Sequence, residues 1–145
     1  TPQLTTLKTF HPTTNYIPTL TMSPTLLQAS AASFVLLSIG HTIKGRQWTA
    51  DPRFKAITGT NSWTCGTLGW YQGSGFFLLT GLLHWQWARD PSLLQDPLNK
   101  AMAGIANILL WASSVWYAKY GIKDTAIVLG ISAALQAFGV GKACL

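Results

Sequence analysis

Charge is scarce in this sequence, and one kind of charged residue is missing altogether. The 145 residues include no glutamate, and the only acidic residues are Asp51, Asp90, Asp96 and Asp124. Charged residues make up 10% of the chain, whereas a soluble domain has about 25%. So few carboxylates exclude an ordinary soluble protein of this length, and they indicate a surface that faces lipid or partner proteins.

The acidic residues are outnumbered by ten lysines and arginines, which give the chain a net charge of +6. A nucleic-acid-binding protein gathers such residues in a patch or along a stripe. Here they lie at the edges of apolar runs, a distribution that is typical of membrane proteins. We therefore expect no nucleic-acid partner.

Patterns that carry chemistry are equally sparse. The two cysteines, Cys65 and Cys144, show no CxxC or metal-ligand spacing, and the chain has no HExxH motif or His/Asp cluster. A phosphate loop, a Ser/His/Asp constellation and a plausible acid–base pair are also missing. We therefore expect no catalytic residue, no metal and no cofactor, and we allow for structural phospholipids.

Residues 1–22 differ in character from the rest of the chain. They contain eight threonines and three prolines, and they follow neither a helical nor a strand period. The prolines favour an extended path. One interpretation is a disordered tail. The other, which we favour, is an extended arm laid over a partner, because a lone tail gains nothing by exposing the aromatic and aliphatic anchors Phe10, Tyr16 and Ile17.

The remainder, residues 23–145, contains four apolar segments, at 23–43, 66–88, 98–118 and 125–141. Each has about 17 to 23 residues and no charge in its interior, which is the length that a helix needs to cross a hydrocarbon core of roughly 30 Å. Short loops join the segments, so that neighbouring helices should be antiparallel. The predicted fold class is an all-α membrane protein, a bundle of four antiparallel transmembrane helices behind an extended N-terminal arm.

Charge and tryptophan predict how this bundle is oriented. An even number of spans puts both termini on one side of the membrane, with four lysines and arginines on that side and six on the other. This bias predicts that the 44–65 loop faces the cytoplasm or the matrix. Tryptophans near both ends of the segments, Trp87 among them, predict an aromatic belt at each interface.

Small residues recur at helical spacing in the second and fourth segments. Such residues let two helices approach closely in lipid, whereas each glycine would cost about 1 kcal/mol relative to alanine in a soluble helix. Amide side chains beside them can hydrogen-bond across a helix interface. The predicted packing and partner positions are Gly69, Gln72, Gly73 and Ser74 in the second segment and Gly130, Ala134, Gln136, Ala137 and Gly141 in the fourth.

His41 marks the point where the first apolar run gives way to basic residues. At the end of a helix, a histidine interacts favourably with the negative end of the macrodipole and with lipid headgroups. We favour this membrane-edge role. The alternative is a pocket at the same face, formed by His41 with Lys44, Arg46 and Tyr71 and with the nearby amide of Gln72.

Two stretches, "GHTIKGRQWTADPRFKA" and "GWYQGSGFFLLTGLLHWQWA", resemble a small family of four-helix membrane proteins. Together with the tail segment "FHPTTNYIPTLTMSP", the chain is similar to a fungal accessory subunit of mitochondrial respiratory complex I. The resemblance implies a supernumerary subunit of the membrane arm, with other subunits and membrane lipids as partners. It also implies the inner mitochondrial membrane, with both termini in the intermembrane space. It supplies no role for Gly40, His41 or Thr42, which match the family pattern.

Two functional hypotheses follow. The first is a non-catalytic accessory subunit of complex I (NADH:ubiquinone oxidoreductase), which supports assembly or stability through helix packing and lipid contacts. The second is a small membrane enzyme or a lipid- or quinone-binding protein that uses the pocket near His41.

Overall fold

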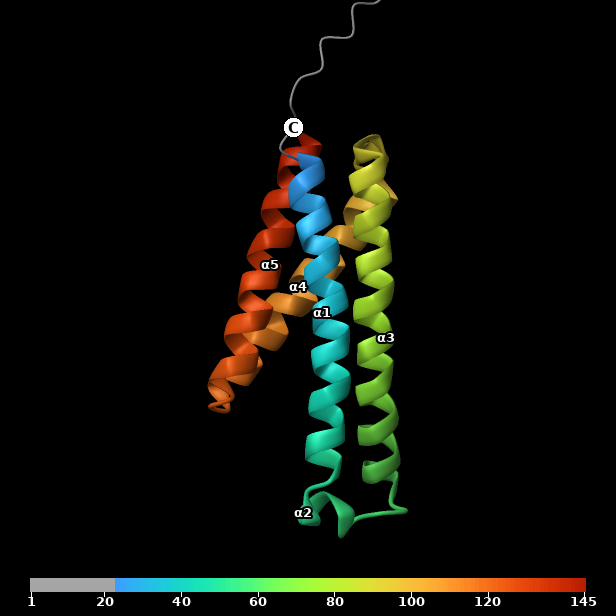
Figure 1. Ribbon diagram of the computed structural model, residues 1–145, viewed down its shortest axis with the longest axis vertical. Helices are drawn as coiled ribbons and strands as arrows, with labels where there is room; N and C mark the ends of the chain where they lie inside the picture. The colour runs from blue at the N-terminus through green and yellow to red at the C-terminus, as the bar shows by residue number, and fades with distance from the viewer. Residues whose placement is uncertain (1–22) are drawn as a thin grey trace, which may run out of the picture.

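The computed structural model describes residues 23–145, which fold into helices and short connecting turns without any strand. The predicted arm, with its anchors Phe10, Tyr16 and Ile17, lies outside the described residues. The helices, shown in Figure 1, are α1 Ser23–Thr49, α2 Pro52–Lys55, α3 Asn61–Arg89, the short 3₁₀ helix η1 Pro91–Gln95, α4 Pro97–Lys119 and α5 Lys123–Cys144.

The first helix is longer than its apolar run indicates. We predicted an end at residue 43, but α1 continues to Thr49. The residues that follow the apolar run include Lys44 and Arg46, which are good helix formers, and no proline occurs before Pro52. We had predicted that His41 lies in the last turn of this helix. It lies eight residues before the end of α1.

The second long helix also begins earlier than predicted, at Asn61 instead of residue 66. Thr60 caps it, because its hydroxyl oxygen accepts a hydrogen bond from the Trp63 backbone N–H over 3.2 Å. Asp51 caps the short helix α2 in a similar way. Most of the predicted 44–65 loop is therefore helical, and only short turns remain on either side of α2.

Every aspartate has a structural contact in the fold. Asp51, Asp90 and Asp96 cap α2, η1 and α4, and each accepts a hydrogen bond from a backbone N–H two residues further along. Such a cap stabilises a helix by about 1 kcal/mol. Asp124, the fourth, forms an ion pair with Lys44 of α1.

The turn between α4 and α5 depends on a glycine. Gly121 has a φ of +79°, in the left-handed region that side chains disfavour. Its backbone N–H donates to the Ala118 carbonyl oxygen, and the Ile122 N–H donates to the Tyr117 carbonyl oxygen. These two bonds form a Schellman motif, which ends α4 and reverses the chain.

The packing order of the long helices differs from their order in the chain. α1 packs against both α3 and α5, while α4 packs against α5. The consecutive helices α3 and α4 are joined through η1 and incline away from one another (Figure 1). α1 and α5 lie close together where α5 ends, and they separate towards the opposite end.

Two clusters of buried side chains hold these helices together. One lies near the end where the described chain begins and ends, and consists of Leu27, Trp87, Ala88, Leu94 and Ala103. The other lies further along the bundle and consists of Phe34, Leu110, Leu129 and Ala133. All four long helices contribute to one or both clusters.

Trp87 belongs to the core instead of the aromatic belt that we predicted for it. Its side chain is 1% exposed, and its Nε1–H donates to the Asn99 side-chain oxygen over 2.9 Å. The bond satisfies the indole donor, which would otherwise be buried without a partner.

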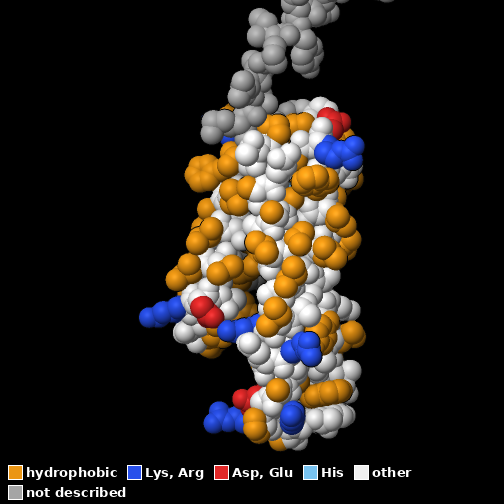
Figure 2. All heavy atoms as spheres, viewed as in Figure 1, with side chains coloured by type: hydrophobic (Ala, Val, Ile, Leu, Met, Phe, Trp, Pro, Cys, Tyr) orange, Lys and Arg blue, Asp and Glu red, His pale blue; other side chains and the backbone are white. Residues whose placement is uncertain are grey.

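Three described helices, α1, α4 and α5, are long and apolar enough to cross a membrane. The second predicted span, now α3, does not meet the same measure, because its leucines and phenylalanines are diluted by tryptophans, glycines and polar residues such as Gln72, His84 and Gln86. The length and hydropathy of the described helices therefore support three membrane spans, and the fourth is not established. Hydrophobic side chains cover the length of the bundle, and lysines and arginines lie towards its ends (Figure 2).

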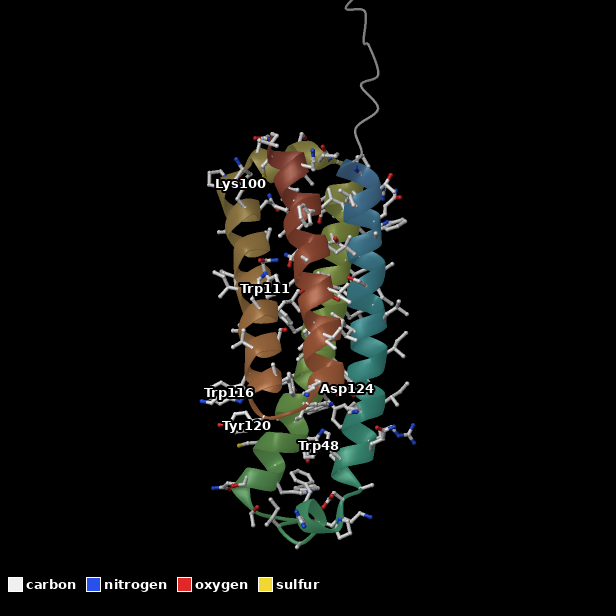
Figure 3. The ribbon with its side chains drawn as sticks, turned by 90° about the vertical axis from the view of Figure 1, so that its left-hand side faces the viewer. Trp48, Lys100, Trp111, Trp116, Tyr120 and Asp124 are labelled. Carbon is white, nitrogen blue, oxygen red and sulfur yellow. The ribbon has the colours of Figure 1, made fainter. Side chains whose placement is uncertain are left out.

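The pair α1 and α3 continues past the turn between α4 and α5, and it ends in a tip that contains α2 (Figures 1 and 3). Aromatic side chains fill this tip. The Trp48 ring lies edge-on to Phe54, with centroids 4.2 Å apart, and contacts Trp70 at 5.2 Å. The tip is therefore packed and does not consist of a loose loop.

Candidate functional site

His41 occupies a tight position between α1 and α3. Its imidazole stacks on the Trp70 indole, with ring centroids 4.1 Å apart and planes 8° from parallel, and it meets the edge of Phe77. Gly73 provides the room, because a Cβ at that position would lie 2.9 Å from the His41 ring. Glycine at position 73 is therefore required for the imidazole to lie against α3.

Hydroxyl groups fix the polar side of the imidazole. His41 Nδ1 lies 3.1 Å from the Ser74 hydroxyl oxygen, which is also 2.9 Å from the Thr42 hydroxyl. Ser38 donates to the Ser74 carbonyl oxygen, and Trp70 Nε1–H donates to the His41 carbonyl oxygen over 2.7 Å. The four residues around His41 carry no charge, so the cluster orients the ring without an ion pair.

Nε2 of His41 remains available in this arrangement. Among the described residues it has no hydrogen-bond partner, whereas Nδ1 faces Ser74. If Ser74 donates to Nδ1, then Nε2 carries the proton and acts as a donor. If Nδ1 donates to Ser74, then Nε2 is an acceptor. Either tautomer leaves one polar atom of the ring for a bound molecule.

Two cavities meet at His41. The first, which we call the cleft, has a volume of about 390 Å³ and is lined by all four long helices. Its walls include Leu37, Val128 and Leu129, with Lys44 and Asp124 at its polar end. The second cavity, of similar volume, lies between α3 and α4 next to Gln72, Phe76 and Leu109. His41, Phe77 and Ser113 line both cavities.

An ion pair spans the polar end of the cleft. Lys44 Nζ on α1 lies 3.1 Å from the Asp124 carboxylate on α5, and both side chains are about half exposed or more. Such an exposed pair contributes little to stability, because solvent screens it. Trp116 and Tyr120 lie at the same level as Asp124 (Figure 3), and the Lys119 ammonium lies over both of their rings.

The pocket predicted around His41 is formed only in part. Lys44 lines the cleft and Gln72 lines the second cavity. Arg46 and Tyr71 are exposed and line neither. The alternative set of pocket residues therefore loses two of its members.

Other residues of the site were not predicted to lie there. These are Trp70, Ser113, Tyr117 and Asp124. One signal was present in the sequence, since Ser38, His41, Thr42 and Gly45 recur at spacings of three and four, as do Trp70, Gly73, Ser74 and Phe77. Residues at these spacings share one helix face, and the two faces meet in the structure.

The predicted packing residues of α3 are divided between the interior and the surface. Ser74 is buried and Gly73 faces His41. A Cβ at Gly69 would meet nothing within 4 Å, so this glycine has no close neighbour among the described residues. Gly69 and Gly73 share a sequence motif, but only Gly73 contributes to the packing of α3 against α1.

The fourth helix shows the same division. Gln136 is buried, its Nε2 donates to the Ala103 carbonyl oxygen over 2.9 Å, and its Oε1 lies 3.3 Å from Asn107 Nδ2. A Cβ at Gly130 would lie 3.2 Å from the Ser114 hydroxyl oxygen. Ala134 is partly buried, while Ala137 and Gly141 are exposed. The inner positions join α5 to α4, and the outer ones lie on the surface.

Titratable and metal-ligating groups are dispersed. No group of three His, Cys, Asp or Glu side chains that could hold a metal ion occurs among residues 23–145. Cys65 and Cys144 are free and lie at opposite ends of the bundle, at the start of α3 and the end of α5. His84 is fully buried, and its Nδ1–H donates to the Thr80 carbonyl oxygen over 2.8 Å.

Comparisons of the chain with family models, with curated proteins and with solved structures return no match in any of the three.

Proposed function

We propose that this chain is a non-catalytic accessory subunit in the membrane arm of NADH:ubiquinone oxidoreductase (complex I), where it supports assembly or stability. The observation that carries the proposal is a set of glycines on the outer faces of the helices. Among residues 23–145, a Cβ at Gly69, Gly104 or Gly141 would meet nothing within 4 Å. Outward-facing glycines in a transmembrane helix favour the close approach of another helix. The identity of the complex rests on the resemblance given above.

Large apolar side chains accompany these glycines. Leu36, Ile108 and Phe138 are each 68% exposed, which is compatible only with surroundings of lipid or apolar protein. Lipid covers such side chains adequately, but it gives no reason for glycine, which disfavours a helix by about 1 kcal/mol relative to alanine. The combination supports a partner protein on at least one face.

In the proposed arrangement all four long helices cross the inner mitochondrial membrane. α3 packs against α1, and Arg89 at its last residue is its only charge. If α1 crosses the bilayer, α3 must therefore lie within it as well. Both ends of the described chain then face the intermembrane space. The matrix side receives Lys44, Arg46, Arg53, Lys55, Lys119 and Lys123.

Gly69→Leu tests the partner surface without disturbing the fold, because position 69 is open. We expect the fraction of the chain that migrates with a megadalton complex on a native gel to fall about tenfold, while the purified variant keeps its helicity. Gly73→Leu, in contrast, would disturb the chain's own packing against His41 and cannot serve this purpose. Gly75→Leu, also at an open position of α3, shows whether the effect belongs to one face.

The wild-type chain provides the first check. Mass spectrometry across the gel slices should detect it in the band that contains NADH dehydrogenase activity. Migration as a small monomer or dimer would contradict the accessory role, and so would a Gly69→Leu variant that assembles normally.

A small membrane enzyme or quinone-binding protein is the second candidate, and the free Nε2 of His41 beside two cavities favours it. In this case the purified chain should bind decylubiquinone, and His41→Phe should weaken binding about tenfold, because it keeps an aromatic ring on Trp70 but removes the nitrogen. Tyr71→Phe is the control, since Tyr71 lines neither cavity. Tryptophan fluorescence quenching measures the binding. A wild-type chain whose fluorescence does not change with decylubiquinone would argue against this candidate.

A further inference from the structure

The cleft opens sideways, between α1 and α5, on the surface that faces the membrane. At one end of the bundle these helices touch, since a Cβ at Gly139 would lie 3.4 Å from the backbone of Leu26. They then diverge (Figure 1). Leu36 and Val128 line the cleft and are also 68% and 51% exposed. Its edge is therefore part of the outer surface of the two helices, and lipid can enter from the side.

The interior of the cleft is suited to a hydrocarbon chain. Most of the surface that lines it is apolar, with Leu37, Phe77 and Leu129 among the lining residues. His41, Ser113 and Ser132 add polar atoms. An empty volume of about 390 Å³ would forfeit the contacts of the atoms that line it. In a bilayer, acyl chains surround the opening. A lipid chain is thus the occupant that the interior fits best.

The polar end of the cleft lies where a headgroup would be. Lys44 and Asp124 face each other there, beside Thr125. Trp116 and Tyr120 lie at the same level (Figure 3), as aromatic side chains do at the interface between hydrocarbon and headgroups. An acyl chain that lies along Leu37 and Leu129 therefore brings its headgroup to Lys44.

Charge at this end favours an anionic headgroup. Four lysines and arginines belong to the ends of α1, α4 and α5 here, against the one aspartate Asp124; they are Lys44, Arg46, Lys119 and Lys123. Basic residues near a membrane surface attract anionic lipid. A zwitterionic headgroup gains little from this excess.

We propose that the cleft is a binding site for one anionic phospholipid, with an acyl chain between α1 and α5 and its phosphate at Lys44. The site belongs to the chain itself and does not depend on membership of complex I. The lipid would fill the space between the diverging helices and fix the position of α5 relative to α1.

Gly40→Leu tests the acyl-chain site. Gly40 lines the cleft, and a Cβ there meets nothing within 4 Å, so the leucine has room to occupy the cleft. The full chain would be reconstituted in nanodiscs of equal parts dioleoyl phosphatidylglycerol and phosphatidylcholine, then transferred to mild detergent for native mass spectrometry. We expect the wild type to retain one phosphatidylglycerol, and Gly40→Leu to retain it at least about tenfold less. Gly104→Leu, on the open face of α4, should retain it like the wild type.

Lys44→Met tests the headgroup and leaves the cleft unobstructed. Retention of phosphatidylglycerol should fall about fivefold, while Lys119→Met, at the same end but outside the cleft, should change it much less. Circular dichroism verifies that each variant is folded. Equal retention in Gly40→Leu and the wild type, or no retained lipid in the wild type, would overturn the proposal. Equal retention of the two lipids by the wild type would overturn the anionic headgroup.

Discussion

Replacing Gly45 with alanine is expected to destabilise the protein by about 1–3 kcal/mol, although alanine is the better helix former. Gly45 is buried on α1, and a Cβ there would overlap the Trp70 indole. The indole cannot retreat without loss, because it donates a hydrogen bond to the His41 carbonyl oxygen and stacks on the His41 ring. One methyl group would thus separate the ends of α1 and α3 and disrupt the cluster around His41.

Gly104→Ala is the matched control for this prediction. Gly104 lies in α4, and a Cβ there meets nothing within 4 Å, so that only helix propensity changes. It should raise the free energy of unfolding by up to about 1 kcal/mol, whereas Gly45→Ala lowers it. Titration with dodecyl sulfate in mixed micelles, followed by tryptophan fluorescence, measures both. An increase in stability for Gly45→Ala would show that Trp70 is not fixed as described.

Gly81→Leu should have a larger effect, a loss of about 3 kcal/mol or more. Gly81 is buried where α3 crosses α1, and its Cβ would lie 3.2 Å from the Ala31 carbonyl oxygen and 3.4 Å from Phe34 Cβ. A backbone oxygen cannot rotate away as a side chain can. The two helices must separate at the point where Phe34 packs in the core with Leu110 and Leu129.

Gly75→Leu introduces the same side chain six residues earlier in the same helix, at a position that is exposed and open. Its free energy of unfolding should stay within about 0.5 kcal/mol of the wild type or rise slightly. The same titration compares the two variants. If they behave alike, the close contact between α1 and α3 at position 81 does not exist in solution.

The four long helices could be predicted from the apolar segments, but their ends could not. The end of an apolar run indicates where contact with lipid or with the core ends. The helix itself continues as long as its residues favour the helical conformation. For this reason α1 extends through Lys44 and Arg46 to Thr49. The helix caps are local features that can be predicted from the sequence, since Asp51, Asp90 and Asp96 each precede a helix start.

The site was harder to predict, because it depends on how α1 and α3 are rotated and registered against each other. Gly69 and Gly73 form one motif in the sequence, and only the rotation of α3 decides that Gly73 meets His41 while Gly69 faces outward. Register enters as well, since the turn around α2 determines that Ser74 lies opposite His41 and Thr42. Neither quantity is encoded in the spacing within a single helix.

The packing order α3, α1, α5, α4 could not be predicted from the sequence either. Short loops suggest that consecutive helices lie side by side. The segment between α3 and α4 instead forms η1, with Leu94 fully buried and packed in the same cluster as Trp87 and Leu27. The α3–α4 connection is therefore fixed at one end of the bundle only, and the two helices diverge from there.

The tip formed by α2 and the ends of α1 and α3 has a consequence for what approaches the protein from the aqueous phase. In the proposed arrangement Lys44 and Trp70 lie at the edge of the hydrocarbon core. With a rise of about 1.5 Å per residue, the part of α3 before Trp70 then extends past the headgroup region, which is roughly 5–8 Å deep on each side. In that arrangement Arg53 and Lys55 of α2 stand in water above the membrane surface. A soluble protein that arrived on this side would then meet a packed, basic projection, and its orientation would be constrained before it touched the lipid.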